Sequence, residues 1–360
     1  MQRHFCCSKS LPQNPSQKRH FSLIWRYMEQ RIAQLAKHLK TILTDAICLQ
    51  PNEQALVIYD TEAPLTRIMT EAYREALPQG RFVDFATVTP GDIFTSIENL
   101  KAGDLVILVQ STNFRLSEFR IRIELFKRGL KAIEHSHLLR MSEDQFDTYI
   151  AALAYDKQRL RRQGHALKNI LDTCSTITVE CEDTKLTFSG GMEDTKLNVG
   201  DYSGMTNVGG TFPIGEVFTE AKDLTKVQGS IRVFGFAGDD HAVRLFSPFI
   251  ATVTDGILDA SDCPAEFTHV LNLIREDEPV TVREFGLGLN DALGKNKIVN
   301  DITAFERQKG LHLSLGAKHA QYNKEGFNRK TGRYHVDIFV DATRILADDV
   351  VIYENGDFTV

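Results

Sequence analysis

The clearest chemical pattern in the sequence is a histidine and an aspartate two residues apart in Tyr334-His-Val-Asp-Ile-Phe-Val-Asp341. On a strand, His335 and Asp337 project from the same face with their Cβ atoms ~7 Å apart. An imidazole and a carboxylate that converge in this way can share a divalent ion. A hydrogen-bonded His–Asp pair on a polar strand face explains the pattern equally well, so the pair alone leaves both interpretations open.

Two glutamates occur where an ordinary strand needs no charge. Glu216 follows the glycine-rich segment 209–215 and begins an apolar run, and glycines there allow the backbone to approach a ligand closely. Alternation predicts that Glu284 shares one strand face with Val280 and Val282, either at the rim of a sheet or buried and paired. Each glutamate also has a purely structural interpretation, as a loop cap or as a paired carboxylate.

A second histidine lies in the segment 310–316, where alternation places His312 and Ser314 on one face and leucines on the other. A lone strand histidine is more often a satisfied core residue than a ligand. Together, however, the separate segments supply oxygen ligands with nitrogen added, a set that suits zinc, cobalt or manganese and holds two ions if one carboxylate bridges them. The candidate metal ligands are Glu216, Glu284, His312, His335 and Asp337.

The first half of the chain alternates between apolar runs and helical periodicity. Helices are predicted at 32–43, 65–76 and 117–129, and strands at 55–59, 81–85 and 104–109. Short apolar strands separated by amphipathic helices are typical of a doubly wound, Rossmann-like parallel sheet. The loop after the first strand reads Asp60-Thr-Glu-Ala-Pro64, so neither a dinucleotide fingerprint nor a phosphate-binding loop is present.

A long polar helix is predicted from Ser142 to about Asp172, and its bases are typical of a solvated face. Near residue 173 the pattern changes to alternating strands at 176–180, 185–188, 230–236, 280–285, 311–315 and 335–340, with one helix at 264–275. The sequence therefore predicts an α/β fold class, with a doubly wound domain over 29–172. A mixed α/β domain with a strand-rich metal site follows over 173–360.

Composition excludes several classes of protein. The 360 residues are 42 % hydrophobic and 25 % charged, which is typical of a globular chain. No run approaches the roughly 18 to 20 apolar residues that span a bilayer, so no membrane association is expected. The net charge of −6 makes nucleic acid an unexpected partner.

The first thirty residues differ from the rest, with five bases and one acid. Residues 1–28 are predicted to be a basic, disordered leader; a weak transit segment or a true start at Met28 are alternatives. The six cysteines include no CxxC pair, so reduced thiols and a cytoplasmic location are expected.

The motifs GEVFT, EFGLGLN, HLSLG and HVDIFVD occur in the same order and at similar separations as in the aminopeptidase T and aminopeptidase S family of metallopeptidases. Most of residues 173–345 resembles this family. The resemblance implies a two-domain homodimer that removes N-terminal residues from peptides or small amides through a water activated by two metal ions. It implies that the five candidate ligands hold those ions.

The resemblance also implies a further acid shortly before His312 and a tyrosine shortly after it. Glu306 is the nearest acid, with the spacing uncertain by about one residue. His319 stands where the tyrosine is expected, and Tyr322 is the substitute after a loop shift. A proton shuttle to the leaving amine is then assigned to Glu216 or Glu306, and an accessory role to Tyr322.

Two alternatives remain open from the sequence. Relatives of this fold resemble mononuclear iron(II) dioxygenases that cleave hydroxypyridine rings with two histidines and one carboxylate. His335 and Asp337 supply two of those ligands, but Glu284 in place of a histidine as the third, and the retained Glu216, argue against this reading. The other alternative is a non-catalytic binding relative that keeps the fold and the metal, to which the altered tyrosine region adds weight.

Overall fold

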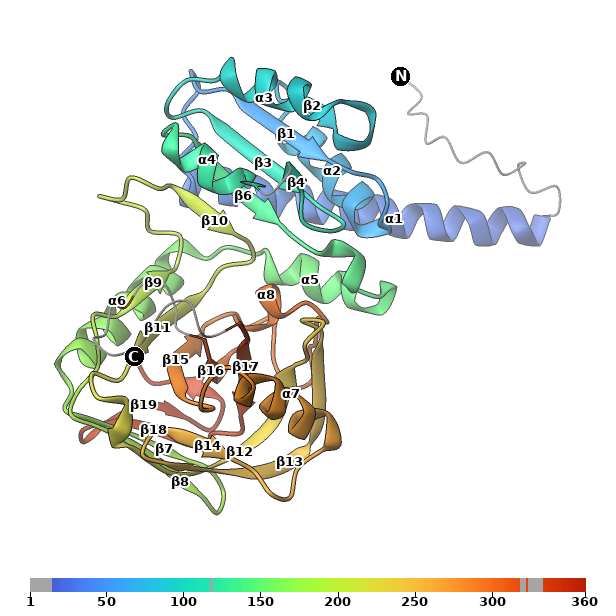
Figure 1. Cartoon of the computed structure of the whole chain (residues 1–360). Helices are drawn as coiled ribbons and strands as arrows, with labels where there is room; N and C mark the ends of the chain where they lie inside the picture. The colour runs from blue at the N-terminus through green and yellow to red at the C-terminus, as the bar shows by residue number, and fades with distance from the viewer. Residues whose placement is uncertain (1–14, 117–118, 318–321, 323–332) are drawn as a thin grey trace.

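The strands of the computed structural model form a parallel sheet and a larger antiparallel sheet (Figure 1). The structure describes residues 15–116, 119–317, 322 and 333–360. The parallel sheet has five strands and the antiparallel sheet has thirteen. This architecture confirms the predicted α/β class.

The parallel sheet has the strand order β10-β6-β3-β1-β2. Its strands are β1 (Ala55–Tyr59), β2 (Arg81–Asp84), β3 (Leu105–Val109), β6 (Lys131–His135) and β10 (Gly209–Thr211). A small hairpin of β4 (Arg115–Leu116) and β5 (Phe119–Arg120) lies outside this sheet. The short β10 was not predicted. It pairs with β6 and brings the segment that precedes Glu216 back to the first sheet.

Helices cover both faces of the parallel sheet, as the alternation predicts. Residues such as Val57 and Ile107 pack with α1 (Pro15–Thr41) and α2 (Pro64–Ala76). Their neighbours in sequence, such as Ile58, pack with α3 (Pro90–Glu98) and α4 (Ile121–Lys127). Adjacent residues of a strand point to opposite faces, so the uniformly apolar strands bury both.

The first helix begins earlier than the sequence predicts. Residues 15–28 belong to α1, in contrast to the predicted disorder, whereas residues 1–14 lie outside the described part of the chain. Arg31 is buried and its Nε atom lies 2.7 Å from Oδ1 of Asp147. This ion pair joins α1 to the helix that contains Asp147.

The predicted continuous helix over 142–172 is wrong. The structure has α5 (Phe146–Ala152), a break, and α6 (Lys157–Thr173). Asp156 causes the new start, because its side chain accepts a hydrogen bond from the Arg159 amide and caps α6. The predicted solvated face is also only partly correct, since Arg159 donates to the Leu289 carbonyl oxygen at 3.1 Å. Lys168 likewise donates to the carbonyl oxygen of Thr195 at 2.7 Å.

The antiparallel sheet has the order β20-β19-β18-β7-β8-β12-β17-β16-β15-β11-β9, with β13 and β14 attached to β12. Its first strands are β7 (Thr176–Glu180), β8 (Lys185–Ser189), β9 (Lys196–Asn198), β11 (Glu216–Glu220), β12 (Val227–Ala237), β13 (Val243–Thr254) and β14 (Ile257–Asp259). The later strands are β15 (Val282–Gly288), β16 (Gly310–Gly316), β17 (His335–Val340), β18 (Arg344–Ala347), β19 (Val350–Glu354) and β20 (Asp357–Phe358).

Short helical elements join these strands. Among the described residues of this half, the α-helices are α7 (Ala265–Arg275), as predicted, and α8 (Ile302–Phe305). Single turns, the first of them a π-helix and the others 3₁₀, lie at Ile42–Ala46, Phe85–Thr87, Leu138–Arg140, Glu143–Gln145 and Leu224–Lys226. The described cysteines Cys48, Cys174, Cys181 and Cys263 are free thiols, as predicted. In the described part of the chain, no helix combines the length and apolar character needed to cross a bilayer.

Candidate metal centre

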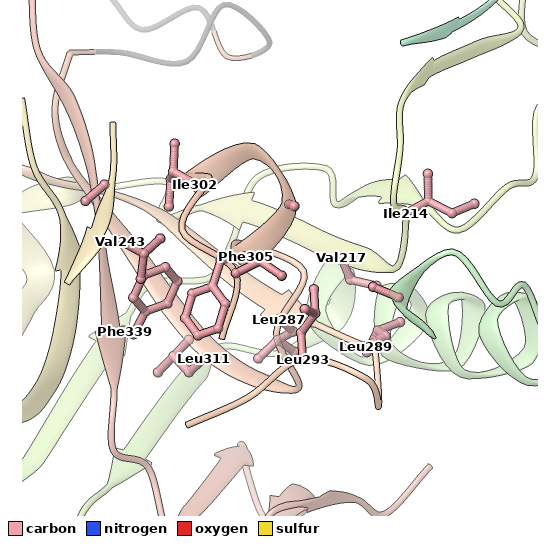
Figure 2. Packing of buried hydrophobic residues seen from close by; sticks show 14 of the residues in the cluster. Ile214, Val217, Val243, Leu287, Leu289, Leu293, Ile302, Phe305, Leu311 and Phe339 are labelled. Atoms are coloured by element: carbon pink, nitrogen blue, oxygen red, sulfur yellow. The ribbon is translucent and has the colours of Figure 1, made fainter. Parts of the chain in front are cut away.

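Four neighbouring strands bring the predicted ligands to one face of the antiparallel sheet. In the order β11, β15, β16 and β17, Glu216 lies opposite Gly288, and Gly286 lies opposite His312. Ser314 lies opposite Asp337 in the next pairing. Directly opposed residues share a face, so residues from four separate segments of the sequence converge. The leucines on the other face, among them Leu287 and Leu311, form part of the core in Figure 2.

A β-bulge in β15 changes which face of the sheet Glu284 occupies, compared with the prediction. The pairing of β15 with β16 shifts between Val282, opposite Leu315, and Phe285, opposite Leu313. The extra residue reverses the alternation, so Val282 and Phe285 both face the core. Glu284 therefore lies on the face opposite to Val282, and the prediction that they share a face is wrong.

Glu216, Glu284 and His312 form a buried cluster in which one ligand atom from each lies within 4.8 Å of the others. Nε2 of His312 is 3.3 Å from Oε1 of Glu216 and 3.5 Å from Oε1 of Glu284. Within the described residues, neither ring nitrogen of His312 has a hydrogen-bond partner. A buried imidazole without such a partner, facing two carboxylates, fits a divalent cation.

His335 and Asp337 form the second part of the centre, as their spacing predicts. Nε2 of His335 lies 3.4 Å from Oδ1 of Asp337. The Ser314 hydroxyl donates to Oδ1 of Asp337 at 2.6 Å, and Nδ1 of His335 lies 3.2 Å from the Ala317 carbonyl oxygen. Such outer contacts fix the ring and the carboxylate in place, which is the usual support of metal ligands.

Electrostatics join the two parts into one acidic centre. Against the effect of burial, Glu216, Glu284 and Asp337 raise the pKa of His312 well above its usual value. Against the same effect, Asp337 and Glu284 raise the pKa of His335 to about 10. Burial opposes the shift at Asp337 too, but His335 and His312 hold its pKa well below the usual range. The surplus of carboxylates thus attracts positive charge, either as protons on the histidines or as a metal ion.

Glu306 and Arg307 complete the centre from the connection 289–309 between β15 and β16. Burial raises the pKa of Glu306 to about 8, more than the adjacent Arg307 lowers it. Nη1 of Arg307 lies 3.1 Å from Oε2 of Glu216 and also forms an ion pair with Glu306. Sequence reasoning found Glu306 but missed Arg307; its only signal is a base next to a candidate acid.

Packing holds the Glu306–Arg307 segment in place. The preceding α8 is capped by Asp301, whose side chain accepts from the Thr303 amide at 3.0 Å. The Phe305 ring packs edge to face on Phe339 with centroids 4.7 Å apart. Figure 2 shows both rings in the core. Glu306 follows α8 directly, so this aromatic contact sets the position of the acid.

The two glycines of the EFGLGLN motif have separate steric roles. A Cβ atom at Gly286 would lie 2.1 Å from Nε2 of His312, so only glycine leaves room for the imidazole. A Cβ atom at Gly288 would lie 2.0 Å from the Gln308 carbonyl oxygen. The motif therefore lets the histidine and the Arg307–Gln308 backbone lie directly on β15.

Tyr322 lies beside the centre, with its hydroxyl directed at backbone. It donates to the carbonyl oxygens of Asp194 at 3.2 Å and Phe218 at 3.3 Å, and burial raises its pKa. These bonds hold the Tyr322 side chain in place, and a part in catalysis stays a prediction. His319, which stands at the expected tyrosine position, lies outside the described residues.

A cavity of about 650 Å³ opens over the centre. Glu216, Glu284 and His335 line it from the antiparallel sheet, and Glu306 and Arg307 from the connection before β16. Residues of the segment 194–211 form another wall. Arg122, from α4 of the parallel-sheet half, also lines it and pairs with Glu134. This volume falls in the usual range of small-ligand sites, about 300 to 1,000 Å³.

Comparison with known proteins shows the fold but no family. No family model and no curated protein sequence matches the chain. The structure of 2,5-dihydroxypyridine dioxygenase from Pseudomonas putida KT2440 matches with a TM-score of 0.62 and 14 % identity, over 91 % of this chain and 98 % of that one. The structure of AmpT from Thermus thermophilus matches with a TM-score of 0.56 and 14 % identity, over 91 % and 99 %.

Proposed function

We propose that this protein is a metal-dependent aminopeptidase that releases N-terminal residues from short peptides or small amides. The observation that carries the proposal is the buried Glu216–Glu284–His312 cluster at the base of a cavity that also contains Glu306. The order of the four motifs and the fold shared with AmpT, an aminopeptidase, support this assignment.

The donor set fits a divalent ion held by carboxylate oxygens and imidazole nitrogens. Glu216, Glu284 and His312 would hold it, and His335 and Asp337 form a second pair of potential ligands beside them. Such an ion, zinc, cobalt or manganese, lowers the pKa of a bound water and polarises a carbonyl group. The protein's own contribution is to keep these ligands rigid through Ser314, the Ala317 carbonyl and Gly286.

Glu306 is the better proton carrier of the two acids that the sequence suggests. Its pKa of about 8 lets it both accept and release a proton near neutral pH. Although burial acts in the opposite direction, Arg307 and His312 lower the pKa of Glu216, which therefore stays ionised. We assign the proton transfer to the leaving amine to Glu306 and metal binding to the ionised Glu216.

The carboxylates around the cavity also explain a preference for a free N-terminus. An ammonium group that enters the cavity meets Glu216, Glu284 and Glu306, which line it together. A neutral blocked terminus gains nothing from these charges. The predicted homodimer and cytoplasmic location rest on the sequence alone.

A second candidate function is an iron(II) ring-cleaving dioxygenase. His312, His335 and Asp337 supply two histidines and one carboxylate, and the charge of Asp337 acts on both rings. From the sequence, the third ligand considered for this alternative was Glu284, and His312 was not considered. The fold shared with the dihydroxypyridine dioxygenase favours the same alternative.

One experiment separates the two functions. Metal-stripped protein is reloaded with zinc, manganese, cobalt or, without air, ferrous iron. Each form is assayed for release of leucine from leucine p-nitroanilide and a leucyl dipeptide, and for oxygen uptake with 2,5-dihydroxypyridine. We expect hydrolysis that chelator stops, that Glu284→Gln reduces at least 100-fold, and that Glu182→Gln, an exposed acid, leaves unchanged. Hydrolysis that survives both chelation and Glu284→Gln refutes the aminopeptidase, and iron-dependent oxygen uptake supports the second candidate.

A further inference from the structure

Arg122 is a cation on the part of the cavity wall that the parallel-sheet half supplies. Its Nη1 atom donates to Oε2 of Glu134 and, at 2.6 Å, to the Thr211 hydroxyl. All hydrogen bonds that this guanidinium forms with the described residues use Nη1. Because a guanidinium has donors on Nε and on both Nη atoms, the edge formed by Nε and Nη2 stays open. Parallel N–H donors on one such edge match the two oxygens of a carboxylate.

The other lysines and arginine of the cavity wall have acidic partners of their own. Lys168 and Lys196 each lie 2.6 Å from a carboxylate oxygen of Asp194. Arg307 pairs with the acids of the metal centre. Arg122 also has an acidic partner, but it uses a single nitrogen for it and keeps one whole edge of the fork. An anion that enters the cavity therefore finds its best partner in Arg122.

The strand beside Arg122 offers backbone groups to the same cavity. β10 is the last strand of the parallel sheet and pairs with β6 alone among the described strands (Figure 1). The Val208 carbonyl oxygen and the Phe212 amide bond to β6, so the alternating residues Gly209 and Thr211 direct their N–H and C=O groups away from it.

Gly209–Thr211 line the cavity, and a Cβ atom at Gly210 would meet no atom within 4 Å. An open strand edge next to a guanidinium fork suits an extended peptide, which pairs through its main chain.

We propose that Arg122 binds the C-terminal carboxylate of short peptides whose free N-terminus lies at the metal centre. This inference rests on the proposed aminopeptidase function and adds a substrate class to it, namely short peptides with both termini free. The charges of the cavity wall are complementary to such a peptide, because Glu216 and Glu284 attract its ammonium group from one half of the molecule and Arg122 attracts its carboxylate from the other. The cavity of about 650 Å³ also has the size of a small-ligand site.

The test compares leucylglycylglycine with its C-terminal amide, because these two peptides differ only in the carboxylate. The kcat/KM for the free peptide, divided by the kcat/KM for the amide, is measured for zinc-loaded wild type, Arg122→Met, Arg122→Lys and Arg128→Met. Arg128→Met is the matched control, since Arg128 follows α4, pairs with Glu124 at 3.1 Å and does not line the cavity. We expect a ratio of at least ~10 in wild type and in the control, and about 1 in Arg122→Met. Arg122→Lys, which keeps the charge but not the fork, should give an intermediate ratio.

A ratio near 1 in wild type, or the wild-type ratio in Arg122→Met, overturns this inference, while hydrolysis of both peptides keeps the proposed function. If Arg122→Met does not fold, the ratios of wild type and Arg122→Lys decide.

Calorimetry with metal-stripped protein measures the same preference without hydrolysis. We expect wild type to bind the free peptide at least ~10-fold more tightly than the amide, and Arg122→Met to lose this difference. If the preference is present but no metal-loaded form hydrolyses either peptide, only the proposed function is overturned. If both the preference and the hydrolysis are absent, both proposals are overturned.

Discussion

His135 and His312 are both completely buried, one in each sheet, yet their surroundings are opposite. In the parallel sheet, Nε2 of His135 lies 2.7 Å from the Tyr73 hydroxyl and Nδ1 lies 3.2 Å from the Tyr149 hydroxyl. Burial lowers the pKa of His135 to about 3, so it is neutral. His312 lies between carboxylates, has no hydrogen-bond partner in the described residues, and has a raised pKa.

The acids of the two sheets differ in the same way. Asp60, after β1, accepts hydrogen bonds from the Ser111 amide at 2.7 Å and from the Ser111 hydroxyl. This edge of a doubly wound sheet is where many such folds bind ligands, but here the protein's own groups satisfy the acid. Glu216 instead depends on charged neighbours. Burial alone therefore does not distinguish the two acids; Glu216 differs because its close partners, Arg307 and His312, are ionisable groups.

The largest expected difference concerns removal of each histidine's side chain. His312→Ala should weaken zinc binding at least ~1,000-fold, about 4 kcal/mol, because it removes a central ligand. His135→Phe should leave zinc affinity within about 3-fold of wild type, since His135 contacts only tyrosines and the core. Calorimetric titration of the two folded variants measures this contrast. Equal losses of zinc affinity in the two variants would contradict the contrast between His312 and His135.

A smaller effect is expected from crowding His312 without removing it. In Gly286→Ala the new methyl group meets Nε2 of His312, so the ring must turn away from Glu216 and Glu284. We expect zinc affinity to fall roughly 10- to 100-fold, the range typical when the support of a ligand is lost. Gly294→Ala is the control, because no atom lies within 4 Å of its added carbon. An unchanged affinity in Gly286→Ala would mean that His312 is not a ligand.

His135 is expected to act on stability instead. His135→Phe leaves the Tyr73 hydroxyl buried without its partner, whereas Tyr149 keeps a bond to the Phe212 carbonyl oxygen at 3.3 Å. One orphaned hydroxyl costs about 2 kcal/mol of unfolding free energy. Urea denaturation of the metal-free proteins measures it. A loss below about 0.5 kcal/mol would argue against the Tyr73–His135–Tyr149 cluster.

The smallest effect is the pH dependence of that loss. Unfolding returns His135 from a pKa of about 3 to its usual value near 6.5, so the unfolded state takes up a proton first as pH falls. The stability that wild type has above pH 6.5 is therefore lost as pH falls toward 3. Between pH 7 and 5.5 this amounts to about 1 kcal/mol, absent in His135→Phe, so the two stabilities converge. If the unfolding free energies of wild type and His135→Phe differed by the same amount at pH 7 and pH 5.5, the lowered pKa of His135 would be contradicted.

Much of this contrast was predictable from the sequence. Alternation placed His312 with Ser314, and the spacing of two placed His335 with Asp337, because strand periodicity is short-ranged and regular. The doubly wound first half followed from the same reasoning. Glu284 was found, but its face was not, because a single-residue bulge reverses the alternation without changing the composition.

Other features depend on contacts between distant segments. The pairing of Gly209–Thr211 with β6 depends on how the two halves meet, and the break before α6 depends on one capping aspartate. Arg307 was missed because a base beside a candidate acid looks like an ordinary surface pair. Only the fold shows that the guanidinium enters the centre and contacts Glu216.

Anomalous diffraction from crystals grown with zinc tests the central claim most directly. We predict a strong anomalous peak within bonding distance of His312 in the antiparallel sheet, shared with Glu216 and Glu284, and no peak near His135. A fully occupied peak elsewhere, with none at His312, or the absence of any peak at saturating zinc, would contradict the account.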